Sequence, residues 1–123
     1  EIPLRLVGSE MCIRDSKNAS FLNYGVVVTK YTGARGKSST SDASAEYVAE
    51  VRALLDRENI VWQMGEMGKV DIGGGGTVAM FVANMGVDVV DLGVPVLSMH
   101  APFETTAKFD VYMCYRAMYE FMK

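Results

Sequence analysis

Several features that identify common protein classes are scarce or missing in this 123-residue sequence. Its two cysteines cannot provide the disulfide framework of a small secreted domain, so a cytoplasmic location is expected. Its formal net charge is −3 and it has no basic stripe, so no nucleic-acid partner is expected. No apolar stretch reaches transmembrane length without a charge or a glycine break, so no membrane span is expected. One histidine, His100, is the sole imidazole for metal binding or catalysis.

The first sixteen residues, EIPLRLVGSEMCIRDS, show no periodicity, helix cap or turn signal that joins them to the rest. A DNA string encoding LVGSEMCIRDS resembles a transposon adapter used in sequencing libraries. We therefore expect residues 1–16 to be a non-native segment, with a natural N-terminal arm as the alternative. Residues 17–123 then form one domain at most, with 10 basic residues, 12 acidic residues and Cys114 as the remaining cysteine.

Hydrophobic periodicity divides the rest of the sequence into alternating strands and helices. Short β-branched runs predict buried strands, and apolar residues at helical spacing predict helices. Ser41 or Asp42 is expected to cap the first helix, because either side chain can accept a bond from a free first-turn N–H. The alternation predicts an α/β sandwich with a mostly parallel sheet. The predicted segments are a strand at Tyr24–Tyr31, a loop at Thr32–Ser41, a helix at Ala43–Glu58, a strand at Asn59–Gly65, a helix at Thr77–Gly86, a strand at Val87–Gly93 and a helix at Thr106–Met122.

Four consecutive glycines lie in DIGGGGT, residues 71–77, just before a predicted helix. Glycine backbone can approach a ligand closely, and the N–H groups at a helix N-terminus favour negative charge. Ligands bind at such strand-to-helix turns in α/β sheets, so Asp71, Gly73 and Gly74 are candidates for a binding site. A flexible loop with a solvated aspartate is the alternative.

The same turn also partly fits a dinucleotide-binding fingerprint. Gly74–Ala79 matches G-x-G-x-x-A, and Asp91 lies near the end of a later predicted strand, some 17 residues on. Against this, two glycines interrupt the preceding segment, and Asp71 would repel a pyrophosphate. The phosphate loop that ends in Lys-Ser/Thr is absent. A nucleotide-binding α/β domain that uses the Gly73–Gly76 turn is therefore kept as the alternative function.

Asp71 and His100 provide a carboxylate and an imidazole, which are ordinary zinc ligands. Each follows a predicted strand or strand-like run, so both could reach one rim of the sheet. Two residues do not complete a zinc site, which takes at least three protein ligands, and a packed core histidine is the alternative. Separately, the cationic segment TKYTGARGKS, with Lys30, could meet a substrate carboxylate or form a solvated face.

Two long segments of the sequence resemble the C-terminal portion of the aspartyl aminopeptidase family, which includes vacuolar aminopeptidase I. They are NYGVVVTKYTGARGKSSTSDASAEYVAEVR and GEMGKVDIGGGGTVAMFVANMGVDVVDLGVPVLSMHAPFETTAKFDVYM. The resemblance implies that residues 17–123 are the C-terminal part of the catalytic domain of a metalloaminopeptidase. It further implies a three-layer α/β/α fold, release of N-terminal amino acids from peptides with two zinc ions, and a homo-oligomer, the dodecamer.

The same resemblance assigns roles to individual residues. Asp71 and His100 match zinc ligands that serve different metals, and Lys30 matches a lysine near the substrate. The family's early histidine, bridging aspartate and adjacent glutamates, one of them the general base, would precede Lys17 and are missing here. We therefore expect Asp71 and His100 as metal ligands, no catalytic base, and no activity from these residues alone. The expected substrate-binding positions are Lys30, Gly73 and Gly74.

Overall fold

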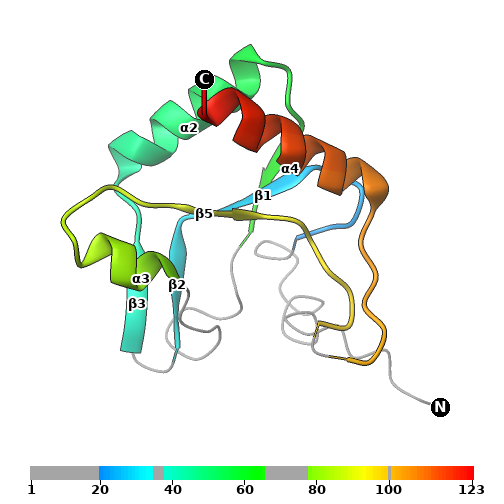
Figure 1. Ribbon diagram of the computed structural model, residues 1–123, viewed down its shortest axis with the longest axis horizontal. Coiled ribbons are helices and arrows are strands. Elements are labelled where there is room, and N and C mark those ends of the chain that lie inside the picture. The colour runs from blue at the N-terminus through cyan, green and yellow to red at the C-terminus, as the bar shows by residue number, and fades with distance from the viewer. Residues whose placement is uncertain (1–19, 35–37, 66–77, 100) are drawn as a thin grey trace.

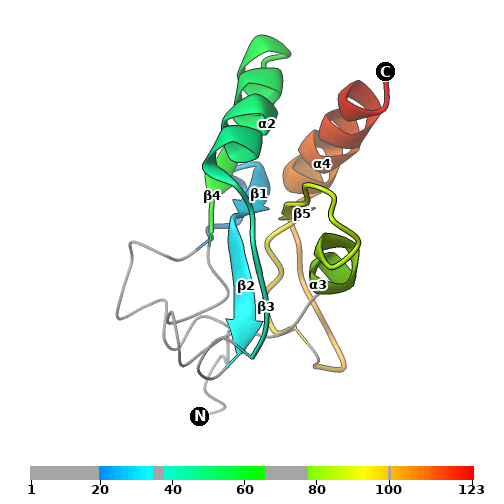
Figure 2. The same cartoon turned by 90° about the vertical axis from the view of Figure 1, so that its left-hand side faces the viewer.

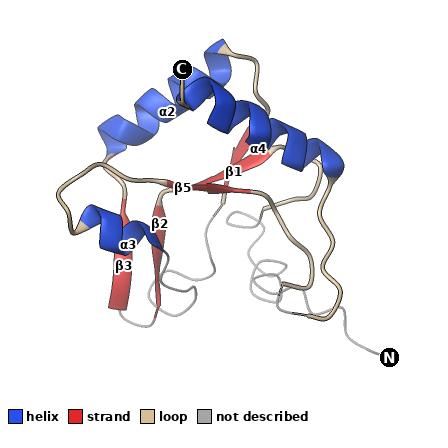
Figure 3. Ribbon diagram, in the orientation of Figure 1, coloured by secondary structure: helices blue, strands red, loops and turns tan. Residues whose placement is uncertain are grey.

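The computed structural model describes residues 20–34, 38–65, 78–99 and 101–123. Within these ranges helices and strands are mixed along the chain, which confirms the α/β prediction (Figure 3). No helix in the described ranges is long and apolar enough to cross a membrane. The elements in chain order are β1 (Val26–Thr29), β2 (Tyr31–Ala34), β3 (Ser38–Asp42), α2 (Ala45–Arg57), β4 (Trp62–Met64), α3 (Val78–Ala83), β5 (Asp91–Gly93) and α4 (Lys108–Phe121).

Three strands form a mixed sheet in the order β4-β1-β5. β1 and β4 are parallel, with Val26 opposite Trp62, as the alternation of strands and helices predicts. β5 runs antiparallel to β1, with Val27 opposite Gly93. The reversal has a physical cause: α3 packs beside β3, beyond the edge where β1 ends, so the chain enters β5 from that edge (Figure 2).

The hydrophobic core lies between this sheet and the two long helices. α2 and α4 lie side by side over one face of the sheet (Figures 1 and 2). Val26 and Val28 are fully buried and point to the same face, as alternate strand residues do. The buried core cluster is Val26, Val28, Val51, Leu55, Ile60, Met113 and Ala117.

α2 begins two residues later than the sequence predicts. Its N-cap is Ser44, whose Oγ accepts a hydrogen bond from the backbone N–H of Tyr47 at 3.2 Å. The predicted caps, Ser41 and Asp42, are instead the last residues of β3. Ser44 can cap the helix because its backbone is extended, at φ −61° and ψ 146°, while its oxygen faces the free first-turn N–H groups.

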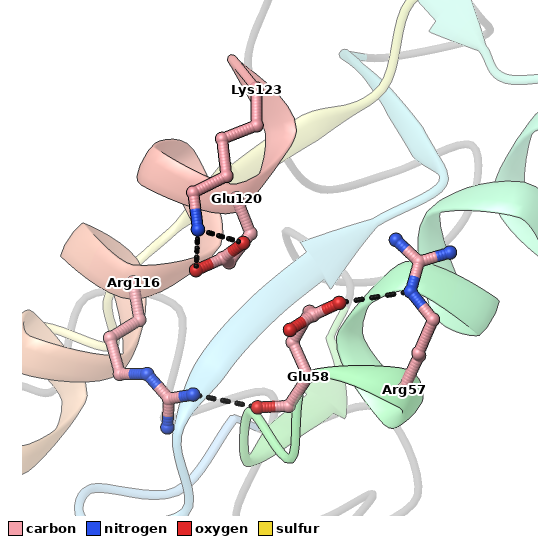
Figure 4. Close-up of polar contacts among 5 residues, drawn as sticks. All are labelled: Arg57, Glu58, Arg116, Glu120 and Lys123. Carbon is pink, nitrogen blue, oxygen red and sulfur yellow. Dashed lines mark hydrogen bonds and ion pairs between the residues drawn. The ribbon is translucent and has the colours of Figure 1, made fainter.

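The C-terminal end of α2 is linked to α4 by one arginine. Arg116 donates a hydrogen bond to the backbone carbonyl of Glu58 at 2.6 Å (Figure 4). It donates a second, at 3.4 Å, to the backbone carbonyl of Asn59. These carbonyls lie where a helix leaves its last acceptors unsatisfied. A cation is also favoured at a helix C-terminus. The link therefore fixes the two covering helices relative to each other.

The predicted loop at Thr32–Ser41 is wrong, because this segment forms most of the β2–β3 hairpin. Thr32 lies opposite Ser41 in the antiparallel ladder, and both are buried. Serine, threonine and glycine are typical of loops in a sequence, but a ladder can satisfy their backbone groups equally well. The predicted strand Tyr24–Tyr31 is correspondingly shorter, and β1 ends at Thr29.

Candidate functional site

The described part of the candidate site is the edge of the sheet where the parallel strands β1 and β4 both end. Lys30 directly follows β1, and Gly65 directly follows β4. The backbone N–H of Gly65 donates to the carbonyl of Val28 at 3.2 Å, so the two chain exits are adjacent. Ligands in α/β sheets bind outside the carboxyl ends of the strands. The fold therefore places Lys30 where a ligand is expected.

Lys30 is ion-paired with Asp42, the last residue of β3. Backbone contacts hold both partners. The N–H of Ala43 donates to the carbonyl of Lys30 at 2.9 Å, and Asp42 lies opposite Tyr31 in the ladder. The side chains of Lys30 and Asp42 remain 37% and 61% exposed, so both are accessible from solvent.

The β2–β3 hairpin and α3 lie next to each other beyond this edge (Figure 2). Ser44, just after the hairpin, donates a hydrogen bond from its Oγ to Asp88 Oδ1 at 3.3 Å, which ties the start of α2 to the segment after α3. The glycine-rich turn precedes α3 in the sequence. The predicted site residues in it, Asp71, Gly73 and Gly74, lie outside the described residues.

A closed loop holds the residues on either side of the single histidine. Leu97 and Thr105 exchange two backbone hydrogen bonds, of 2.8 and 3.2 Å. Within the loop, the N–H of Ala101 donates to the carbonyl of Ser98 at 2.9 Å, and Ser98 has φ +58°. His100 belongs to this loop but lies outside the described residues, so its assignment as a metal ligand stays a prediction.

The direction of β5 differs from the parallel direction that the sequence analysis used to expect Asp71 and His100 at one rim of the sheet. β4 ends at the ligand-binding edge, and Asp71 follows it in the sequence, outside the described residues. β5 begins at that edge, where Asp91 pairs with Thr29, and its other end lies at the opposite edge. The strands β4 and β5 therefore end at opposite edges of the sheet, so the expectation that the ends of both strands share one rim is wrong. Asp71 and His100 both lie outside the described residues, and their proximity stays a prediction.

The described residues do not provide a metal site by themselves. Within them, no group of three or more His, Cys, Asp and Glu side chains could hold a metal ion. Burial raises the pKa of the Cys114 thiol, which makes it a poorer metal ligand because thiolates bind zinc. A zinc site in this fold must therefore use residues outside the described ranges, as predicted for Asp71 and His100, whose donor groups suit zinc.

Two described carboxylates have roles that the sequence did not reveal. Asp42 was expected to cap a helix, and it pairs with Lys30 instead. Asp110 was not singled out, but it is fully buried and accepts bonds from the backbone N–H groups of Asn23 and Gly25. The contact between Asp42 and Lys30 was not predicted because the β2–β3 hairpin that brings them together was predicted as a loop. No sequence signal indicates the contacts of Asp110, because its partners are distant backbone groups.

Comparison with known families identifies relatives over most of the chain. Residues 12–122 match the family described as aminopeptidase I zinc metalloprotease (M18). A probable M18 family aminopeptidase 1 from Thermotoga maritima is 51% identical over 111 residues, covering 88% of this chain and 25% of the relative. A protein with the same description from Clostridium acetobutylicum is 49% identical over 100 residues, covering 81% of this chain and 22% of the relative.

Solved structures show the same likeness. The crystal structure of an M18-family aminopeptidase from Thermotoga maritima matches with a TM-score of 0.84 and 51% identity, over 89% of this chain and 24% of that one. A structure of PhTET1-12s, described as a dodecamer, matches with a TM-score of 0.63 and 20% identity, over 84% and 28% of the two chains. The second likeness concerns the fold alone. The chain spans about a quarter of the length of its curated relatives.

Proposed function

The chain belongs to the aminopeptidase I zinc metalloprotease (M18) family. We propose that the longer protein, which has the length of these relatives and contains this chain, removes N-terminal amino acids from peptides by zinc-assisted hydrolysis. The observation that supports this most strongly is the combination of 51% identity and a TM-score of 0.84 to one solved M18-family aminopeptidase. The comparisons give no support to the alternative of a nucleotide-binding domain built on the Gly73–Gly76 turn.

The residues of this chain have distinct parts in the proposed reaction. The carboxylate of Asp71 and the imidazole of His100 would hold metal. When bound, the two zinc ions supply a Lewis acid for the scissile carbonyl and a water of lowered pKa. Gly73 and Gly74 would bind the peptide through their backbone, since glycine carries no side chain to keep a ligand away. Lys30, at the ligand-binding edge of the sheet, donates hydrogen bonds to the substrate.

The general base is not among the residues of this chain that we assign. A base shuttles the proton from the attacking water to the leaving amine, and its loss typically lowers turnover about 10²–10⁴-fold. This chain covers 25% of the length of its relative. We therefore assign the general base and the remaining metal ligands to the part of the longer protein that this chain does not cover. The 123-residue chain alone is proposed to be inactive.

Assembly and location follow from the same proposal. α4 and its C-cap residue carry exposed large apolar side chains, namely Val111, Tyr112, Tyr115, Met118, Tyr119, Phe121 and Met122. Apolar patches of this kind mark surfaces that other protein covers. The rest of the longer protein or a second copy would cover such a surface, since this chain spans 25% of its relative's length. We propose a homo-oligomer, the dodecamer that the family resemblance implies. The cytoplasm is the proposed location, supported by the low cysteine content.

The direct test is hydrolysis by the longer protein, expressed from the gene that contains this chain. The proposal predicts release of N-terminal residues from peptides with a free amine, and no cleavage of the same peptides after N-acetylation. Treatment with a zinc chelator should abolish the activity, and added zinc should restore it. Chelator-resistant cleavage, or cleavage of acetylated peptides, would contradict the proposal.

A further inference from the structure

The loop between β5 and α4 is closed at its base by a side chain as well as by the backbone. Leu97 and Thr105 exchange two backbone hydrogen bonds. Beyond this pair, the hydroxyl of Thr106 donates a hydrogen bond to the backbone carbonyl of Pro95 at 2.9 Å. The described residues of this segment extend away from α2 and α4, to the same side of the sheet as the β2–β3 hairpin (Figures 1 and 2).

The Thr106 hydroxyl takes the place of a backbone donor. Leu97 and Thr105 form an isolated antiparallel bridge. Hydrogen-bonded pairs recur at every second residue of an antiparallel ladder, so the next pair would be Pro95 and Ala107. Proline has no N–H to donate, and Ala107 is already the N-cap of α4. The ladder therefore ends after one bridge, and the Thr106 side chain provides a donor for the Pro95 carbonyl.

Helix capping does not account for this hydroxyl. A threonine at the N-cap accepts a hydrogen bond from the free first-turn N–H groups. The N-cap of α4 is the next residue, Ala107, whose side chain has no acceptor. The described bond of the Thr106 hydroxyl instead joins two segments that are 11 residues apart.

Both of these segments are anchored in the fold. Pro95 follows β5 by two residues, and Gly93 of β5 lies opposite Val27 of β1. Thr106 comes just before α4, in which Asp110 accepts hydrogen bonds from the backbone N–H groups that precede β1. The bond from Thr106 to Pro95 therefore joins two fixed points of the fold at the base of the loop.

A fixed base has a consequence for a metal ligand carried by the loop. The side chains of a metal site must be held within about 0.5 Å of their productive geometry. A loop that becomes ordered only on binding loses affinity through its entropy, whereas a loop that is ordered beforehand does not. The closed base of this loop therefore favours metal binding by a side chain within it.

We propose that Thr106 is a positioning residue for His100, and that its hydrogen bond to Pro95 raises the affinity for the zinc ion that His100 holds. This inference rests on the proposed function, in which His100 is a zinc ligand. Thr106 acts through the loop and is not a catalytic residue.

The test measures zinc affinity in the longer protein by competition with a chelator. Thr106→Val keeps the shape of the side chain but removes the hydroxyl. It should weaken the binding of one of the two zinc ions about three- to tenfold, the size expected for one hydrogen bond. Thr106→Ser, which restores the hydroxyl, should return the affinity toward the wild-type value.

Hydrogen exchange of the metal-free longer protein provides a second measurement that does not depend on zinc. The amides of Leu97 and Thr105 should exchange faster in Thr106→Val, because the base of the loop opens more often, and the amides of α2 should be unchanged.

Thr105→Val is the matched control, because it removes a hydroxyl from an exposed threonine at the adjacent position. Its hydrogen bonds to Leu97 use backbone groups, which valine keeps. This variant should leave both the zinc affinity and the exchange of the loop unchanged.

The outcomes separate this inference from the function on which it rests. Absence of bound zinc in the wild type refutes the proposed function. Two bound zinc ions, with the same affinities in the wild type and in Thr106→Val, refute the role of Thr106 and leave the aminopeptidase function standing, whether or not the loop exchanges faster. An equal loss of affinity in Thr105→Val or in Thr106→Ser also refutes that role.

Discussion

The carboxylate of Asp110, in the first turn of α4, accepts a hydrogen bond of 2.7 Å from the backbone N–H of Gly25, 85 residues earlier in the chain. A second bond of 2.7 Å comes from the N–H of Asn23. The carboxylate is fully buried, and the positive end of the α4 dipole also favours it. This contact joins the start of the last helix to the entrance of the first strand, at the opposite edge from Lys30.

Asp110→Asn should therefore destabilise the chain strongly. An asparagine keeps one acceptor, but its amide group faces the second N–H, which is then buried without a partner. We expect a loss of about 2–4 kcal/mol in the free energy of unfolding, measured by urea titration. Glu50→Gln, an exposed change on α2, should stay within about 0.5 kcal/mol. Equal stability of the two variants would contradict the role given to Asp110.

Gly25 itself should tolerate no side chain. It has φ +89°, and a Cβ built on it would lie 2.0 Å from the backbone carbonyl oxygen of Val61. Gly25→Ala should cost more than about 3 kcal/mol, since relief requires movement of the strand backbone. Gly86 is the matched control, because it has φ +78° but nothing within 4 Å of its would-be Cβ. Gly86→Ala should cost only about 1 kcal/mol. Similar losses for both would show that backbone angle, not the close approach, dominates at Gly25.

Cys114 should react slowly as a thiol. Burial raises its pKa, so its contribution to stability is complete below the pKa of the unfolded state and is lost as pH rises through the folded-state pKa. Alkylation of the folded chain between about pH 8 and 10 should be slower, with a higher pH midpoint, than alkylation in urea. Cys12→Ser leaves Cys114 as the only thiol for this measurement. Identical pH midpoints in both states would contradict the effect of burial.

The sequence predicts the two long helices well because their apolar residues recur at helical spacing. On α2, Val48, Val51 and Leu55 recur at this spacing and are buried. On α4 the helix itself is found, but its buried residues are Asp110, Met113 and Ala117, and the apolar Val111, Tyr115 and Met118 are exposed. The hairpin was missed because Thr32 and Ser41 are polar, and their burial depends on partners that only the folded ladder supplies. The antiparallel direction of β5 was missed for a similar reason. A short apolar run indicates a buried strand and gives no information on its orientation.

The residues of the candidate site could be predicted from the sequence less completely than the helices and strands. Lys30 was singled out from its cationic segment and from the family resemblance, and the structure adds its place at the ligand-binding edge. Asp42 was misassigned, because its pairing with Lys30 follows from the register of β2 and β3. The zinc assignments of Asp71 and His100 rest on the chemistry of their side chains and on the resemblance, and they stay predictions.

The 123-residue chain should bind zinc weakly and show no peptidase turnover. The described residues contain no group of three or more metal-binding side chains, and the proposed Asp71 and His100 serve different metals. Each ion would then have one protein ligand from this chain, fewer than the three that zinc sites in proteins use. Equilibrium dialysis with zinc, followed by an anilide assay, measures both properties. Tight, stoichiometric zinc binding by the 123-residue chain alone would contradict the claim that most zinc ligands lie in the rest of the longer protein.

The most direct test of the central claim is zinc content and peptide hydrolysis measured together in the longer protein and in His100→Ala. The wild type should hold two zinc ions, and the variant should lose bound zinc and activity in parallel, because alanine has no donor atom. Phe103→Ala is the matched control, since Phe103 is an exposed residue of the same loop, at 89%, and has no metal-binding group. It should keep both zinc ions. Undiminished zinc and turnover in His100→Ala would contradict the assignment of this histidine as a metal ligand.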